Sequence, residues 1–419
     1  MVPKEWVTKD LRSISLLITK GSTPTTYGHE FVEQSENSIR FVGAYNCSFD
    51  GKFKSDSEKW ISKEADELLK RSKLNDKDCI ICIVGNTIGS NFLVSKEIIP
   101  ANINQNVAII RADEGKVNSR YLHYWIMSQY IQDQVQQEAS TQAQPSLSLK
   151  QVGDFTIALP PLNEQNRIAK ILSTWDKAIN TTEQLLANSQ QQKKALMQQL
   201  LTGKKRLLDN NGVRFSGEWK KSTLGNLGNT FNGLTGKTKD DFGFGKKYIP
   251  YINIFKNSRI DLEALDLVDV KEGESQSLTQ FGDIFFTTSS ETPDEVGMSS
   301  VLLDQADEVY LNSFCFGFRL FDFKSLLPEF ARYLLRSENI RSEIAVLGQG
   351  ATRYNLSKKQ LMKLELVLPN INEQKKIATI LSTADQEIAA LQQKLDALKL
   401  EKKALMQQLL TGKRRVKIN

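Results

Sequence analysis

The stretch "KKALMQQLLTGK" is written twice in this chain, at residues 193–204 and 402–413, without a single difference. The two copies are 209 residues apart, and the same offset aligns "LPPLNEQNRIAKILSTWD" (159–176) with "LPNINEQKKIATILSTAD" (368–385). Because twice this offset nearly equals the full length of 419 residues, the repeat accounts for almost the whole chain. An internal repeat of this kind predicts two similar structural units.

Each half is a variable segment followed by a constant one. Backwards from the constant segments the similarity fades, although a few positions still match at the offset: Tyr124, Ser128 and Ile131 meet Tyr333, Ser337 and Ile340. Near the start of each half, "KEW" (4–6) resembles "GEW" (217–219). We therefore expect four regions, namely a variable domain over 1–158, a constant helix over 159–206, a second variable domain over 207–367 and a second constant helix over 368–419.

The constant segments predict two long helices that pair. In the second copy apolar residues recur at alternating steps of three and four, which is typical of a coiled-coil seam: Ile377, Leu381, Ala384, Ile388, Leu391, Leu395, Leu398, Leu405 and Leu409. The first copy has polar residues on its stripe at Thr182, Ser189 and Lys193, and Lys402 interrupts the second. Polar seam residues weaken packing but fix the register. One helix of about 60 Å is not stable alone, whereas two in one chain can pair.

Capping signals mark both ends of these helices. Asn163 and Asn372 are the expected N-caps, with Glu164 and Glu373 in the first turn, where the helix dipole favours an anion. At the far ends we expect Gly203 and Gly412 as left-handed C′ residues, followed by the basic triplets 204–206 and 413–415.

The variable segments predict mixed α/β domains. Residues 79–85 form an apolar run typical of a buried strand, and "DIFFTT" from Asp283 has a similar place in the second half. Helical spacing follows at 121–135 and 330–344. The predicted fold class is thus α+β, with two mixed α/β domains separated by two long helices that pair in an internal repeat.

Composition excludes several classes of protein. A net charge of +6 permits nucleic-acid binding but confines it to particular faces. Apolar stretches are far too short to span a membrane, and residues 1–12 lack the apolar core of a signal peptide, so we expect a cytoplasmic protein. Four cysteines form no disulfide framework in a chain this long, which agrees with that expectation: Cys47, Cys79, Cys82 and Cys315.

Catalytic and cofactor motifs are incomplete. "GLTGKT" (233–238) has Phe231 where a phosphate-binding P-loop needs glycine, so we interpret Lys237 as a residue of a surface loop. Cys79 and Cys82 lie inside the apolar run and are interpreted as buried strand residues, and His123 as a packing residue of a helix. The chain lacks the tetrapeptide of an adenine methyltransferase. We therefore expect no catalytic residue, no metal ligand and no cofactor in this chain.

The paired motif "LP-x-x-NEQ-x-x-IA-x-ILS", each copy followed by a helix that ends in "KKALMQQLLTGK" and preceded by a dissimilar domain, resembles the specificity subunit of a type I restriction-modification enzyme. The resemblance covers the whole chain. It implies that each variable domain is a target-recognition domain that reads one half of a bipartite, asymmetric DNA sequence. It also implies that the two helices pair as an antiparallel coiled coil in a pseudo-twofold internal repeat. This helix pair would set the spacer between the half-sites and dock modification subunits. A helix of about 60 Å is long enough to hold two readers about 34 Å apart, one turn of DNA.

The resemblance also implies partners and cofactors. Two modification subunits, which bind S-adenosylmethionine and methylate adenine, assemble on the specificity subunit, and up to two restriction subunits, which use ATP and Mg²⁺, can join them. The specificity subunit itself is not catalytic. The expected partners are thus double-stranded DNA and these two kinds of subunit, with no membrane.

Loops that match the family motifs supply the candidate DNA contacts. "GSTPTT" (21–26) and "VGNTIG" (84–89) match in the first half, whereas "GLTGKT" (233–238) and "SSETPDEVG" (289–297) depart from the pattern in the second. Polar and cationic loop residues suit base edges and phosphates. The candidates are Ser22, Thr23, Tyr27, Arg40, Asn86, Thr87, Ser90, Asn91 and Gln142 in the first domain, and Lys237, Lys239, Lys246, Lys247, Asn253, Lys256, Arg259, Ser289, Arg353 and Tyr354 in the second.

Two other functions compete with this prediction. A repeat coiled-coil scaffold could join protein partners without reading DNA, although dissimilar domains give a scaffold no obvious advantage. The chain could instead be a self-contained methyltransferase, in which case it would bind S-adenosylmethionine without a partner. The absence of the catalytic tetrapeptide argues against this alternative. Salt-dependent binding to duplex DNA separates the scaffold from a DNA reader.

Overall fold

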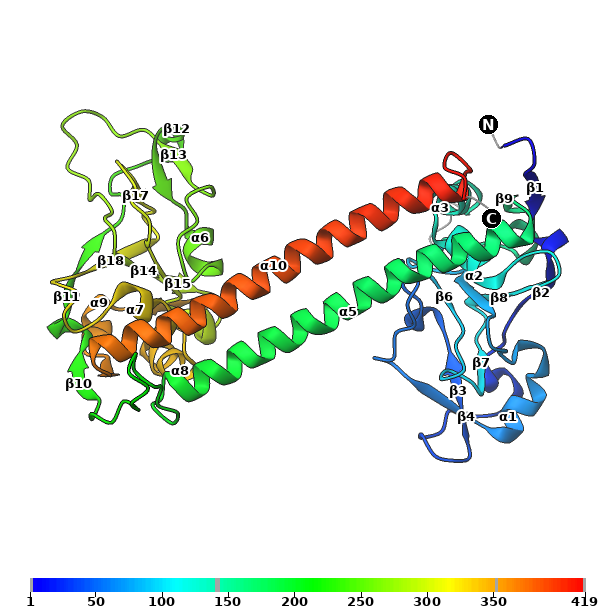
Figure 1. Ribbon diagram of the computed structural model, residues 1–419, viewed down its shortest axis with the longest axis horizontal. Helices are drawn as coiled ribbons and strands as arrows, with labels where there is room; N and C mark the ends of the chain where they lie inside the picture. The colour runs from blue at the N-terminus through cyan, green and yellow to red at the C-terminus, as the bar shows by residue number, and fades with distance from the viewer. Residues whose placement is uncertain (1–2, 140–143, 351–352, 417–419) are drawn as a thin grey trace. The chain divides into compact units, whose positions relative to one another are not determined.

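The computed structural model describes residues 3–139, 144–350 and 353–416 (Figure 1). The chain divides into two compact units, and each is formed by segments far apart in the sequence. The first unit consists of residues 1–183 and 394–419, and the second of residues 184–393. Each unit therefore holds one variable domain and one part of each constant helix.

The first domain contains a four-stranded sheet and a three-stranded sheet. The larger sheet has the order β2-β8-β5-β6, and the smaller has the order β4-β3-β7, in which β3 and β7 are parallel. A short antiparallel pair, β1 and β9, closes the domain beside the constant helix. The strands are β1 (Val7–Asp10), β2 (Ser15–Lys20), β3 (Ser38–Val42), β4 (Lys59–Ser62), β5 (Cys79–Cys82), β6 (Asn91–Leu93), β7 (Ala101–Ile103), β8 (Val107–Ala112) and β9 (Thr156–Leu159).

The second domain repeats this topology. Its larger sheet has the order β11-β18-β14-β16, its smaller sheet β13-β12-β17 with β12 and β17 parallel, and β10 pairs with β21. The strands are β10 (Lys220–Thr223), β11 (Gly228–Asn232), β12 (Phe242–Ile249), β13 (Asp266–Val268), β14 (Ile284–Thr287), β15 (Ser289–Ser290), β16 (Ser299–Val301), β17 (Tyr310–Leu311), β18 (Cys315–Leu320), β19 (Gly348–Gln349), β20 (Tyr354–Leu356) and β21 (Glu365–Leu368). Two sequences that share little thus build the same fold.

The central strands β5 and β14 lie where the apolar runs predicted them, and every residue of both is buried. Each is preceded by a buried aspartate that accepts two hydrogen bonds from an arginine of the neighbouring strand, β8 or β18. Arg111 binds Asp78 with both contacts at 2.8 Å, and Arg319 binds Asp283 at 2.8 and 2.7 Å. Such charge-assisted pairs satisfy a carboxylate that burial would otherwise penalise. Cys79 and Cys82 are buried free thiols of β5, as predicted.

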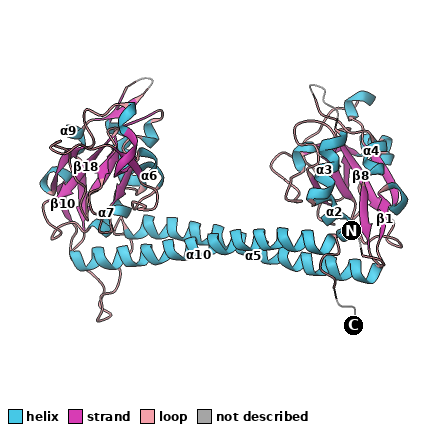
Figure 2. Cartoon of the chain, turned by 90° about the horizontal axis from the view of Figure 1, so that it is seen from above, coloured by secondary structure: helices cyan, strands magenta, loops and turns pink. Residues whose placement is uncertain are grey.

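Short helices cover the sheets (Figure 2). They are α1 (Lys63–Leu68), α2 (Ser119–Met127), α3 (Gln129–Glu138) and α4 (Leu149–Asp154) in the first domain, and α6 (Tyr251–Lys256), α7 (Pro328–Leu334), α8 (Glu338–Leu347) and α9 (Lys358–Leu361) in the second. Each helical segment expected after the central sheet is broken in two at a serine. The hydroxyls of Ser128 and Ser337 donate to the carbonyls of Trp125 and Leu334, both at 2.6 Å, and turn the chain there.

The constant segments form the helices α5 (Leu162–Leu200) and α10 (Ile371–Leu410). In the first unit Asp176 of α5 pairs with Lys402 of α10, and Glu183 pairs with Lys399. A later residue of α5 thus contacts an earlier residue of α10, as expected of antiparallel helices. In the second unit the contacts from Ser189 to Glu387 and from Lys193 to Asp385 run the same way. The predicted antiparallel pairing is therefore confirmed. At about 1.5 Å per residue, α5 is about 58 Å long.

The helix ends correct one prediction. Both helices begin before Asn163 and Asn372, so these residues are not the N-caps. In the second half Asn370 caps instead, because its side chain accepts from the Glu373 amide at 3.0 Å. At the far ends Gly203 and Gly412 have φ values of 70° and 71°, as predicted for left-handed C′ residues. In the described part of the chain, no helix is both long enough and apolar enough to cross a membrane.

Candidate nucleic-acid interface

The loop after the first strand of the larger sheet starts at a glycine in each domain. A side chain on Gly21 would place its Cβ 1.7 Å from the Ile103 carbonyl oxygen, and one on Gly233 would lie 2.1 Å from the Asn312 carbonyl oxygen. Only glycine permits such close approach of two backbones. The "GSTPTT" and "GLTGKT" motifs therefore occupy equivalent loops, although their sequences differ.

A second loop follows the central strand and is paired with the segment that precedes the constant helix. In the first domain the Gly85 amide donates to the Pro145 carbonyl at 2.9 Å, and the Leu147 amide donates to the Ile83 carbonyl at 2.9 Å. In the second domain β15 pairs with β20. In each domain the loop after the central strand thus lies beside the segment that leads into the constant helix.

The candidate contacts divide into three groups. The first group has exposed or half-buried side chains on loops, turns, strands and the end of α6: Ser22, Tyr27, Asn86, Thr87, Lys239, Lys247, Lys256, Arg353 and Tyr354. Tyr27 is 55 % exposed at the end of the 3-10 turn Pro24–Tyr27, and the glycine that follows it has a φ of 79°. These residues remain predictions.

The second group is engaged in contacts within its own domain. Arg40 pairs with Glu58 at 3.1 Å, donates to the Ile98 carbonyl at 2.7 Å and lies over the Trp60 ring. Thr23 binds Gln105, and Lys246 pairs with Glu308. Further ion pairs join Lys237 to Glu274 and Arg259 to Asp304, both at 2.5 Å. The Lys237 side chain is only 5 % exposed, so this lysine is not available to DNA, although its neighbours Gly236 and Thr238 are exposed, as expected of a surface loop.

The third group is buried. Ser90, Asn91, Asn253 and Ser289 are all less than 9 % exposed, and the Asn253 side chain donates to the carbonyls of Asp261 and Ala264 at 2.8 and 2.9 Å. Their burial excludes these four side chains from the candidate interface, and three of them belong to β6, α6 and β15 rather than to loops. Gln142 lies outside the described residues.

Charge is distributed unevenly along the sequence. Residues 159–206 hold eight Lys and Arg against three Asp and Glu, and residues 368–419 hold ten against five, so each constant segment has a net charge of +5. The variable segments have net charges of −1 and −3. The net charge of neither variable segment favours DNA, so DNA binding by the domains would depend on specific polar contacts from their loops.

A buried glutamate at the start of each constant helix binds an arginine that follows the end of the other helix. Arg415 donates to both oxygens of Glu164 at 2.8 and 3.0 Å, and Arg206 donates to both oxygens of Glu373 at 2.6 and 2.7 Å. The two glutamates are at most 1 % exposed. The sequence predicts basic triplets where the helix dipole favours cations, and in the structure the last arginine of each triplet forms this pair. Hydrogen bonds from Arg415 to Glu164 and Glu5 raise the pKa of the arginine.

The glutamine after each glutamate joins the constant helix to its variable domain. Gln165 accepts from the Asn118 amide at 2.8 Å and donates to the carbonyls of Lys116 and Pro160 at 3.1 and 2.8 Å. Gln374 makes the equivalent bonds to Leu327, Ser325 and Pro369 at 2.9, 2.8 and 2.9 Å. Three equivalent hydrogen bonds in each unit thus hold the start of the constant helix against its domain.

A third pair of contacts crosses the two helices and reaches the domain. Lys402 binds Asp176 at 2.5 Å and lies 5.5 Å from the centre of the Tyr124 ring, whose hydroxyl also donates to Asp176. At the 209-residue offset, Lys193 binds Asp385 at 2.5 Å and Tyr333 donates to Asp385 at 2.7 Å. The polar seam residues Lys193 and Lys402 therefore fix the helix register, as predicted.

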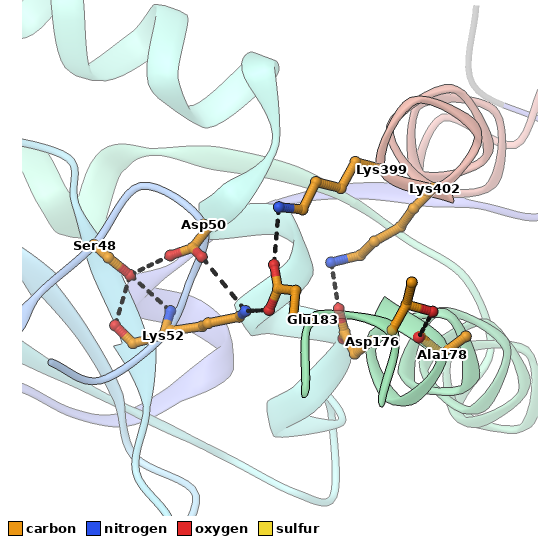
Figure 3. A network of polar contacts seen from close by, with 9 residues as sticks. Ser48, Asp50, Lys52, Asp176, Ala178, Glu183, Lys399 and Lys402 are labelled. Atoms are coloured by element: carbon orange, nitrogen blue, oxygen red, sulfur yellow. Dashed lines mark hydrogen bonds and ion pairs between the residues drawn. The ribbon is translucent and has the colours of Figure 1, made fainter. Parts of the chain in front are cut away.

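One further network occurs in the first unit alone (Figure 3). Glu183 accepts from Lys399 of α10 at 2.8 Å and from Lys52 of the first domain at 2.6 Å. Partial burial raises the pKa of Glu183, but hydrogen bonds from Lys399 and Lys52 lower it below its usual value overall. The second half carries Gln392 and Gln190 at the positions of Glu183 and Lys399, so this ion pair is not repeated.

His123 makes the first domain sensitive to acid. Burial lowers the pKa of His123 to about 3, whereas an unfolded histidine has a pKa near ~6.5. As the pH falls below ~6.5, the unfolded chain takes up a proton that the folded chain does not, so stability falls. Between pH 7 and pH 5 we expect the free-energy advantage of wild type over His123→Gln to shrink by about 2 kcal/mol.

Urea unfolding at several pH values, followed by fluorescence, measures this difference. His29→Gln, which removes the other histidine, is the control. A gap between wild type and His123→Gln that stays constant from pH 7 to pH 5 would contradict the assignment.

The sequence held signals for the residues that join helix and domain. Tyr124, Asp176 and their equivalents matched at the offset, but a shared tyrosine alone did not reveal its partner. Gln165 and Gln374 stood in the repeated "NEQ" without an assigned role. Antiparallel alignment of the helices would have placed each buried glutamate opposite a basic triplet. Within the described residues, no three His, Cys, Asp or Glu side chains are grouped as metal ligands would be.

Two domains of one topology, each joined by the same contacts to an antiparallel helix pair, define a two-module protein whose variable loops differ between modules. The model of the family described as "Type I restriction modification DNA specificity domain" matches residues 3–188 and again 216–400. This chain therefore belongs to the type I restriction-modification DNA specificity family.

Curated relatives agree with this membership. The chain is 26 % identical over 369 residues to the type I restriction enzyme MjaVIII specificity subunit of Methanocaldococcus jannaschii, covering 82 % of this chain and 80 % of the relative. It is 28 % identical over 330 residues to the putative MjaX specificity subunit of the same organism, covering 74 % and 72 %. A specificity subunit of Escherichia coli, EcoBI, is 26 % identical over 300 residues, covering 66 % and 61 %.

Solved structures share the fold. The specificity subunit of Thermoanaerobacter tengcongensis matches with a TM-score of 0.51 at 19 % identity, covering 99 % of this chain and 98 % of that one. The specificity subunit of M. genitalium matches with a TM-score of 0.58 at 14 % identity, covering 99 % and 97 %. A chain from a type I restriction-modification system studied for its assembly matches with a TM-score of 0.60 at 19 % identity, covering 99 % and 100 %. The predicted fold class is confirmed.

Proposed function

We propose that this chain is the non-catalytic, DNA-reading subunit of a cytoplasmic type I restriction-modification complex. Each variable domain reads one half of a bipartite, asymmetric target, and the helix pair sets the spacer and docks two modification subunits. Up to two restriction subunits join the assembly. S-adenosylmethionine, ATP and Mg²⁺ belong to these partners, and this chain binds none of them.

One observation carries the proposal. Two domains with one topology but different loops are joined by equivalent contacts to antiparallel helices, which suits two readers of different sequences on one frame. An internal repeat with pseudo-twofold symmetry presents the same kind of partner surface twice, which supports a stoichiometry of two modification subunits. A protein scaffold without DNA reading would leave the divergent loops without a use.

The test combines assembly with methylation. We expect the chain, mixed with its cognate modification subunit, to form a complex that methylates adenine at one bipartite sequence. The modification subunit alone should not select that sequence. Calorimetry on the isolated chain should show no heat of S-adenosylmethionine binding. Failure to form the complex, or methylation that is unchanged by this chain, would refute the proposal.

A further inference from the structure

The repeated helix end forms one wall of a groove in each unit. In the second unit Lys194, Met197 and Gln198 line a cavity of about 890 Å³ together with Ile388 of α10. In the first unit the residues at the 209-residue offset line a cavity of about 560 Å³: Lys403, Met406, Gln407 and Ile179. The third wall of each groove is the turn between the two short helices of the domain, α2–α3 or α7–α8.

The constant residues of the groove divide into an inner and an outer layer. The inner lysines, Lys193 and Lys402, are engaged by aspartates of the opposite helix. The outer lysine and glutamine are exposed, and the helix seam does not require them. Their identity in both copies therefore needs a different explanation.

The second unit shows what the outer pair binds. Lys194 pairs with one carboxylate oxygen of Glu338 at 3.0 Å, and the Gln198 amide donates to the other at 2.8 Å. These two bonds lower the pKa of Glu338. Lysine and glutamine one helical turn apart thus form a two-point site for a carboxylate.

The first unit carries the same site without its carboxylate. The position of Glu338 is taken by Gln129, whose amide turns away and donates to Asp133 at 2.8 Å. Across residues 3–139, 144–350 and 353–416, neither the Lys403 nor the Gln407 side chain has an ion-pair or hydrogen-bond partner. The apolar floor of this groove also includes Phe49, which is 59 % exposed, and Met127.

We infer that the two grooves are unequal docking sites for one carboxylate-bearing segment of the modification subunit. The groove at Lys403 and Gln407 is open, whereas Glu338 occupies the equivalent site at Lys194 and Gln198 as an internal substitute. The first copy of the partner therefore binds in the first unit, and the second copy must displace Glu338. The net charge of +5 on each constant segment favours an acidic partner segment. This inference rests on the proposed function.

Exchange between glutamate and glutamine should open the second groove or close the first. Glu338→Gln should release the second groove, and Gln129→Glu should place a carboxylate in reach of Lys403 and Gln407. Exposed ion pairs are weak, so we expect the second dissociation constant to fall about two- to fivefold in the first variant. The first dissociation constant should rise by a similar factor in the second variant.

Titration of the full chain with the modification subunit, followed by native mass spectrometry, separates the two binding steps. Two charge reversals assign each binding step to a groove. Lys403→Glu should weaken only the first step, and Lys194→Glu should weaken only the second. Glu343→Gln, an equal charge change on the exposed side of α8, is the matched control and should shift neither step.

The inference is supported if the wild-type chain binds its two modification subunits with unequal affinity, if Glu338→Gln lowers the second dissociation constant, and if Gln129→Glu raises the first. Two equal steps in the wild type, or equal shifts in Glu338→Gln and Glu343→Gln, overturn it while leaving the proposed function intact. Absence of any binding by the wild-type chain would instead refute the proposed function.

Discussion

A chain in which residues 7–159 are replaced by residues 220–368 is expected to direct methylation to a symmetric target. Both domains would then read the half-site that belongs to the second domain, and antiparallel helices would present these half-sites as an inverted repeat. The exchange preserves the bonds of Gln165, because the second domain supplies equivalent backbone atoms at Leu327 and Ser325. It also preserves the contact to Asp176, because Tyr333 replaces Tyr124. Sequencing of methylated adenines in cells that carry the chimera measures the new target.

The reciprocal chimera, with residues 7–159 in both places, is the matched control and should yield an inverted repeat of the other half-site. Together the two symmetric targets should contain both halves of the wild-type target. If an assembled, methylating chimera kept the asymmetric wild-type target, the assignment of one half-site to each domain would be wrong.

Glu373→Ala is expected to lower the free energy of unfolding of the second unit by about 2 kcal/mol. Breaking a buried ion pair typically costs about 3 to 5 kcal/mol, because one charge is left without a partner. Here Arg206 retains 20 % side-chain exposure and can regain water, so we expect less. For a unit of this size the thermal midpoint should fall by about 4 to 8 °C.

Calorimetric unfolding measures this shift. Glu164→Ala should affect the first unit similarly, with the added loss of the hydrogen bond from the Trp6 indole at 3.1 Å. Glu365→Ala is the control, because its pairing with Lys221 joins two side chains that are 69 % and 77 % exposed and should contribute little. Equal midpoints for Glu373→Ala and Glu365→Ala would show that the buried pair does not stabilise the unit.

The long helices, their pairing and the central strands could be predicted from the sequence because their signals are periodic and local. The seam residues Lys193 and Lys402 already indicated a fixed register, and β5 and β14 follow unbroken apolar runs. The common topology of the two domains could not be predicted, since most of their strands have only two to six residues and carry too little pattern. What the domains share is a set of backbone positions, such as the close approach at Gly21 and Gly233.

The candidate interface was harder to predict than the fold. Ser90 and Asn91 stand in a Gly-rich loop and resemble exposed polar residues, yet the loop folds them inward. Arg40 and Arg259 have the right chemistry for DNA but satisfy carboxylates of their own domains. Composition identifies side chains that can contact DNA, whereas tertiary partners decide which ones are available to do so.

The bonds made by Gln165 and Gln374 have a consequence for how such proteins change over time. All six bonds go to main-chain amides and carbonyls, and none depends on a side chain of the variable domain. Substitutions in a domain can therefore accumulate without disturbing these six bonds. An unrelated domain can be attached by recombination if its backbone follows the same path. New DNA specificities can thus arise in one step, while the helices and the partners that bind them stay unchanged.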